Sequence, residues 1–425
     1  MRVLPGVTPR LAVLAIVYGG IAGLVAALTF TGMTALQSVV WDTGAQLFGT
    51  NTTLQIVTTI LLGGALLIVL DRAAPSEDLQ TLLRQSGDPA GLPRRAILTT
   101  ALAAIVAVAF GGAVGPEAGI VAVVAQLSTI VAHLIGEDVA MRRTIGEAGS
   151  AGALGGFYGS PPGAAAIDGD ELGPRKVLQL GAGFAGFFAF LAFMRLTPDT
   201  GGATITLPAV DLPYVDPWLI GIAVVAALAG LLFRGLHHAI DGAVSRIRRP
   251  WIVIALGTVL FAALAAVVPL VRFSGHHELH DLQVLTEAGD WSTLLVVAIA
   301  KIAALTLCLV SGWRGGEFFP LVFIGAAIGG AVAVLVPGLE IGAAMATGMA
   351  ATTAVGWKRP LAVLLILILL VDVPMAFPLL IGVGVAFLVN LLVSRRGGTS
   401  ADSGSEEAGA GSSDPNDADG SRAAR

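Results

Sequence analysis

Charged residues are scarce in this sequence. Only 12% of the 425 residues are Asp, Glu, Lys or Arg, whereas soluble domains carry roughly 25%. Hydrophobic residues make up 55% of the chain, and the mean hydropathy is +0.85. These values exclude an ordinary soluble globular protein and indicate an integral membrane protein of the cell membrane.

Aromatic residues and cysteine are scarce as well. Phe, Trp and Tyr together account for 6% of the chain, and few segments alternate between apolar and polar residues, so membrane helices are favoured over a barrel. The single cysteine, Cys308, excludes a disulfide within the chain and leaves the redox compartment open.

Apolar runs that are long enough, or nearly long enough, to cross a bilayer occur along most of the chain. They cover residues 11–37, 54–70, 96–110, 118–135, 177–194, 218–233, 251–271, 292–311, 360–371 and 376–394. The first run is too long for a cleaved signal peptide and is expected to remain as a helix. Arg395 and Arg396 follow the last run and predict a cytoplasmic C-terminus.

The chain is expected to contain two membrane halves, residues 1–196 and 218–396, joined by a polar connector at 197–217. Residues 397–425 are rich in Gly, Ser, Ala and Asp and contain six acids against two arginines. This composition predicts a disordered acidic tail.

Each half contains a glycine-rich turn that opens an apolar helix, Gly111–Glu117 in the first and Gly312–Glu317 in the second. A second break follows each turn after a similar interval, at Pro161 and at Pro360. Corresponding interruptions in two halves are typical of inverted-repeat transporters with a site near the membrane midplane. Because unpaired N–H groups and the helix dipole favour anions at a helix start, two such turns predict an anion pathway.

Several of these segments resemble the CLC chloride channels and transporters. Gly-Gly-Glu-Phe-Phe-Pro at 315–320 is similar to the family's Gly-x-Phe-x-Pro element. Residues 112–116 resemble its Gly-Lys/Arg-Glu-Gly-Pro element, and 157–163 resemble the Phe-Asn-Ala-Pro-Leu-Ala-Gly stretch that follows. Shorter similarities lie at 273–275 and 358–361, so the resemblance covers roughly residues 11–394.

The resemblance implies an all-α protein with an inverted repeat of many tilted and broken helices. It also implies a homodimer in which each subunit has its own anion path and backbone amides hold the ion. Carried over residue by residue, the anion site would be framed by Gly115, Pro116, Glu117, Gly316, Phe318 and Phe319.

The departures from the family pattern bear on mechanism. Val114 occupies the position of the family's gating glutamate, and a valine can neither exchange a proton nor compete with an anion. Glu117, three residues later, is either a displaced gate or a cap of the helix start. Glu317 presents the same alternatives at the second turn, where the capping role is favoured. The family's serine-bearing turn has no clear counterpart at 71–75, and its last helix, which carries a tyrosine ligand, is not apparent.

Three acids, Asp168, Asp170 and Glu171, lie near the position of the family's internal proton glutamate, although a solvated loop is the favoured explanation. His276, His277 and His280 form an incomplete ligand set, so no metal site is expected. Ser160 and His133, with Asp168, contain the residue types of a hydrolytic triad, but no nucleophile elbow accompanies them.

The sequence therefore predicts passive conduction of small anions, with chloride foremost, through a site formed by two helix N-termini. Proton-coupled anion exchange through Glu117 is the alternative. An intramembrane hydrolase and a scaffold that does not transport are alternatives of other classes. The protein is not expected to be an enzyme, and its expected partners are a small anion, the lipid bilayer and a second copy of the chain, with no cofactor and no nucleic acid.

Overall fold

The computed structural model describes residues 8–74, 79, 81, 83, 94–135, 139–167, 169, 173–197, 204–210, 214–371 and 375–409. The predicted all-α class is confirmed. Apart from two isolated backbone bridges, this part of the chain forms helices and connecting turns. In chain order the helices are α1 (Pro9–Phe48), α2 (Thr52–Ala73), α4 (Arg94–Ala109), α5 (Glu117–Ile135), α6 (Val139–Phe157), α7 (Pro161–Ala166), α8 (Pro174–Leu196), α9 (Trp218–Val244), α10 (Pro250–Val267), α11 (Leu279–Glu287), α12 (Trp291–Val310), α13 (Phe318–Leu335), α14 (Ile341–Trp357), α15 (Pro360–Leu370) and α16 (Ala376–Gly409).

Local sequence sets several of the helix starts. The side chains of Thr8, Asn51 and Asp290 each accept a hydrogen bond from the backbone N–H three residues later. Each side chain thereby satisfies one of the unpaired donors at a helix N-terminus. Proline occupies the first turn of α1, α7, α8, α10 and α15, where its missing N–H costs nothing.

Among the described residues, nine helices are long and apolar enough to cross a membrane: α1, α2, α5, α8, α9, α10, α12, α13 and α16. The predicted apolar runs coincide with helices to within a few residues, except that α1, α9 and α16 extend further. The runs leave out α13, although the second glycine turn predicted an apolar helix that begins there. They also miss α6 and α14, because these two helices are built largely from Gly, Ala and Thr rather than from large apolar residues.

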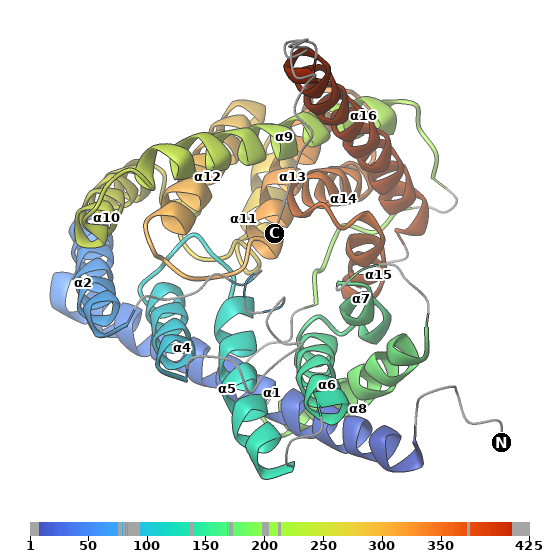
Figure 1. Cartoon of the computed structure of the whole chain (residues 1–425). Helices are drawn as coiled ribbons and strands as arrows, with labels where there is room; N and C mark the ends of the chain where they lie inside the picture. Colours follow the sequence, from blue (N-terminus) through green and yellow to red (C-terminus); the bar gives the residue numbers. More distant parts are fainter. Residues whose placement is uncertain are drawn as a thin grey trace, which may run out of the picture.

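The helices gather into two groups. In Figure 1, α1 and α4 to α8 lie on one side of the molecule and α9 to α16 on the other. Helix α2, which precedes α4 in the first half of the chain, packs on α10 of the second group, and α7 of the first group packs on α15 of the second. The two halves meet at these contacts. The described part of the connector joins the second group, since the N–H of Ile205 donates to the carbonyl of Leu370 at 2.8 Å.

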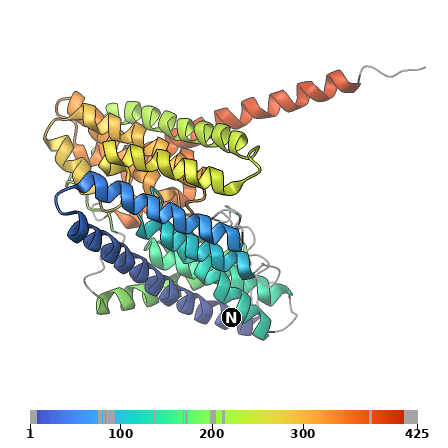
Figure 2. The same cartoon turned by 90° about the vertical axis from the view of Figure 1, so that its left-hand side faces the viewer.

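The last helix does not end at the predicted boundary of the tail. Its backbone continues past Arg396 to Gly409, and Figure 2 shows α16 extending away from the body of the bundle. Residues 410–425 of the predicted tail lie outside the described residues.

Small residues allow the helices to approach at close range. A Cβ atom added to Gly23 of α1 would overlap the backbone of Gly186 in α8, and one added to Gly186 would overlap Gly152 in α6. The same close contact joins Gly325 of α13 to Gly348 of α14. Small side chains at helix crossings permit this packing in lipid, and α13 and α14 are consequently almost wholly buried.

This packing predicts opposite effects for two glycine substitutions. Gly23→Ala places a methyl group against backbone that cannot move aside, so we expect a loss of about 1–3 kcal/mol in stability. Gly235→Ala in α9 meets no atom within 4 Å and should stabilise that helix by about 1 kcal/mol. Thermal melting of the detergent-solubilised proteins measures both effects. An unchanged melting temperature for Gly23→Ala would contradict the packing.

Candidate functional site

The two glycine-rich turns meet in the centre of the molecule. The N–H of Gly115 donates to the carbonyl of Gly316 at 2.8 Å, and the N–H of Gly316 donates back to the carbonyl of Gly115 at 2.8 Å. This reciprocal pair, called the glycine crossing below, brings together segments that lie about two hundred residues apart in sequence. It lies just before two helix starts, at Glu117 for α5 and at Phe318 for α13.

The Glu117 side chain folds back over the glycine crossing. It is fully buried, and a Cβ atom added to Gly115 or to Gly316 would overlap its carboxylate. The backbone amides of Glu117 and Phe319 face this group. Within the described residues, its Oε2 atom has no hydrogen-bond partner of ordinary geometry. A carboxylate thus occupies the place where both helix N-termini favour negative charge.

Tyr158 supplies the hydroxyl nearest to this carboxylate. Its OH lies 3.4 Å from Glu117 Oε1 and donates to it. The residue follows the end of α6 directly and is 1% exposed. The sequence motifs indicated a break in the chain at this point but did not identify the tyrosine. A signal was nevertheless present in the sequence. The chain has only three tyrosines, and this one lies beside a glycine turn inside an apolar stretch, where a polar hydroxyl is unusual.

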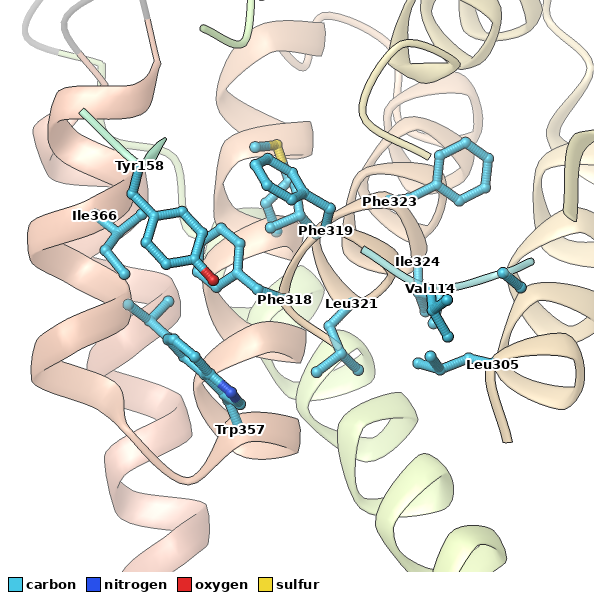
Figure 3. Close-up of a cluster of buried hydrophobic side chains, with 14 of the residues drawn as sticks. Val114, Tyr158, Leu305, Phe318, Phe319, Leu321, Phe323, Ile324, Trp357 and Ile366 are labelled. Carbon is cyan, nitrogen blue, oxygen red and sulfur yellow. The ribbon is translucent and has the colours of Figure 1, made fainter. Parts of the chain in front are cut away.

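Aromatic rings hold Tyr158 in place. Its ring centroid lies 4.9 Å from that of Phe318, 6.1 Å from that of Phe319 and 6.3 Å from that of Trp357. Figure 3 shows these rings clustered at the start of α13. Edge-to-face and tilted pairs at these distances are favourable, so rings from the second half of the chain position the phenol, which belongs to the first half.

The other predicted site residues lie at or beside the glycine crossing. Val114 is buried against Gly315, where an added Cβ atom would overlap its side chain. Pro116 and Phe319 line a small cavity of about 30 Å³, together with Ser274 and His276 from the segment before α11. Glu317 is half-buried at the N-cap of α13, and its side chain makes no capping hydrogen bond.

Lys301 fixes one wall of this cavity. Its buried ammonium donates to the carbonyls of Val271, Arg272 and Phe273 at 3.1, 3.1 and 2.7 Å. The N–H of Phe273 in turn donates to the carbonyl of Gly111 in the first turn at 3.1 Å. This lysine therefore fixes the loop whose Phe273 lines the cavity, a role that no motif in the sequence indicated.

Of the remaining sequence candidates, Asp168, Asp170 and Glu171 lie outside the described residues. Ser160 and His133 are described, and both are hydrogen-bonded away from the glycine crossing. The Oγ of Ser160 donates to the carbonyl of Leu365 at 2.7 Å and accepts from the N–H of Gly163 at 3.1 Å, so it caps α7. His133 Nδ1 is hydrogen-bonded to the carbonyl of Thr129 in its own helix.

Comparison with known proteins gives one consistent result. Residues 77–391 match the family model described as "Voltage gated chloride channel". Proteins named "Putative ion-transport protein YfeO" from Salmonella newport and Salmonella typhimurium are 31% identical to the chain over 269 residues. That match covers 60% of this chain and 62% of theirs, so the chain spans less than two thirds of these relatives.

Solved structures share the fold at low sequence identity. A slow cyanobacterial Cl⁻/H⁺ antiporter has a TM-score of 0.72 and 19% identity, over 92% of this chain and 99% of that one. A CLC-type fluoride/proton antiporter has a TM-score of 0.66 and 20% identity, over 89% and 95% of the two chains.

The glycine crossing predicts the effect of adding bulk within it. Gly316→Val would place atoms where the Glu117 carboxylate lies and would crowd the turn. We expect anion flux in liposomes to fall at least tenfold, because an increase of about 1.4 kcal/mol in the activation free energy of transport slows the rate tenfold. Gly173→Val, at the extended turn before α8 with no atom within 4 Å of an added Cβ, is the matched control and should keep wild-type flux. Wild-type flux in a folded Gly316→Val protein would contradict this placement.

Proposed function

The chain belongs to the voltage-gated chloride channel (CLC) family, and from this premise we propose that it carries small anions, chloride foremost, through the glycine crossing. The observation that carries the proposal is the Glu117 carboxylate, which lies over two paired helix starts contributed by both halves of the chain. A site that accommodates a tethered carboxylate has the charge preference that a free anion requires. For the anion to enter, this side chain has to leave.

We propose further that Glu117 is the gate and that its movement couples anions to protons. A carboxylate that leaves the amides of two helix starts for an apolar surrounding is far more stable in its neutral, protonated form. Entry of an anion would then accompany uptake of a proton by Glu117. The burial of this group favours coupled exchange over the passive conduction that Val114 had suggested, and passive conduction remains the second candidate on account of that valine.

Tyr158 is proposed as a ligand of the transported anion. Its hydroxyl points at the same carboxylate, so displacement of Glu117 would leave this donor facing the incoming ion. The family's serine and tyrosine ligands have no clear counterpart in this chain. In this arrangement the phenol of Tyr158 and the backbone amides bind the anion in their place.

We infer the orientation in the membrane from two helices that run in the same direction. Near their starts, Ile381 of α16 packs against the cluster that contains Leu219 of α9. Further along both helices, Arg234 donates to Asn390 at 3.0 Å. Both helices therefore end on one face, which carries the basic side chains Arg246, Arg248, Arg249 and Arg395. We propose that this face is cytoplasmic and that the protein is a homodimer, as is typical of the family.

The coupling proposal is tested in liposomes with an imposed chloride gradient. Wild-type protein should drive protons uphill, whereas Glu117→Gln, which cannot titrate, should abolish proton movement and leave anion leak. Glu317→Gln, at the corresponding position of the second turn, is the control and should keep coupling. Anion flux without proton movement in the wild type would reject coupled exchange in favour of passive conduction, and absence of any flux would reject transport.

The role of Tyr158 is tested by Tyr158→Phe, which keeps the ring and removes the donor. A hydrogen bond to a charged group contributes about 1.5–3 kcal/mol, so chloride binding measured by calorimetry should weaken roughly 10- to 150-fold. Tyr18→Phe removes a buried hydroxyl that bonds Ser128 elsewhere in the first half, and it should leave binding unchanged. Wild-type affinity in Tyr158→Phe would remove this residue from the site.

A further inference from the structure

A second cavity lies away from the glycine crossing, between α9, the turn from α14 to α15 and the C-terminal part of the α16 membrane span. Its volume is about 460 Å³. Two basic side chains line it, Arg234 from α9 and Lys358 from the turn, and no acidic residue lines it among the described residues. Two cations that share an uncompensated cavity favour an anionic occupant.

Arg234 is held in a fixed position at this cavity. One guanidinium nitrogen donates to Asn390 Oδ1 at 3.0 Å, and Asn390 Nδ2 donates to the carbonyl of Ala354 at 3.1 Å. This chain of bonds ties the arginine to both α16 and α14. An arginine has five N–H donors, so the anchored guanidinium keeps others with which to bind an anion in a planar, two-pronged manner.

Lys358 occupies a backbone conformation that favours glycine. It follows the end of α14 with φ 57° and ψ 28°, in the left-handed region. Helices commonly end on glycine in this conformation, because a Cβ atom makes it unfavourable. The lysine is exposed and forms no hydrogen bond or ion pair with the residues that the structure describes. An exposed ammonium without a polar partner in the described part of the chain, on a backbone conformation that favours glycine, is free to bind an anion.

The cavity also has an apolar side that faces outward. Phe387, Leu391 and Val393 of α16 line it and are 55%, 37% and 39% exposed. These residues belong to the part of α16, Ala376–Arg395, that has the length and composition of a membrane span. A soluble anion would use only the two cations, whereas an amphiphile would also use this apolar side.

We propose that this cavity binds the phosphate headgroup of an anionic phospholipid, with Arg234 and Lys358 on the phosphate and the acyl chains along α16. Basic pockets between helices near the membrane surface bind such headgroups. The cavity shares no lining residue with the small cavity at the glycine crossing. Lys358 directly follows Trp357, whose ring packs on Tyr158, so a bound lipid would adjoin the aromatic cluster without entering the proposed anion site.

The experiment uses the full-length protein in nanodiscs that contain phosphatidylcholine and phosphatidylglycerol, with bound phosphatidylglycerol counted by native mass spectrometry. Lys358→Gly removes one charge and relieves the strained backbone. Because a basic residue near the surface contributes about 1 kcal/mol to anionic lipid binding, affinity for phosphatidylglycerol should fall about fivefold. The melting temperature in phosphatidylcholine alone should stay the same or rise. If Lys358 had a purely structural role, Lys358→Gly would lower the melting temperature.

Two further variants complete the test. Lys358→Gln removes the charge while keeping the strained backbone, and it should lose the same lipid. Arg248→Gln removes an exposed arginine on the same face but outside the cavity, and it should bind phosphatidylglycerol like the wild type. Wild-type binding by either Lys358 variant would overturn the proposal. If inorganic phosphate displaced phosphatidylglycerol at equal concentration, the cavity would be a site for free phosphate, and the proposal of a lipid headgroup would be wrong.

Discussion

The reciprocal hydrogen bonds between Gly115 and Gly316 are the interaction on which the site depends. Backbone N–H and C=O groups buried in a membrane protein cannot form hydrogen bonds with water, so a non-helical segment there needs hydrogen-bond partners from the protein itself. Each glycine turn supplies the partner for the other. This pairing joins the two halves at one point and sets the starts of α5 and α13 beside each other, so the proposed anion site is a direct consequence of satisfying two interrupted backbones.

The glycine crossing leaves little room for side-chain ligands, and the molecule places one acid and one phenol there. Glu117 and Tyr158 come from the first half, but the rings that position Tyr158 belong to Phe318, Phe319 and Trp357 of the second half. Lys301 adds a buried positive charge close by and holds the loop that lines the cavity. The site is therefore polar at its centre and is enclosed by rings and close-packed helices, which exclude water and strengthen its electrostatics.

The proposed lipid site follows a different design from the anion site. At the glycine crossing the donors are mostly backbone amides enclosed by protein, whereas the second cavity has long basic side chains beside exposed apolar residues. The first arrangement suits a small ion stripped of water, and the second suits a large amphiphile. Lys358 links the two regions, because its turn ends α14, which packs against α13.

The sequence by itself determined the membrane class, the positions of most helices and the two glycine turns, because apolar runs, capping residues and glycine clusters act locally. It also placed Glu117 at the first turn of its helix, although it could not distinguish a cap from a gate. Helices α6 and α14 escaped prediction, since their burial rests on close contacts between small residues of distant helices. Only the tertiary structure brought Tyr158 to Glu117 and Lys358 to Arg234. These pairs are separated by 41 and 124 residues, and the packing of the helices, rather than any local sequence signal, determines that they meet.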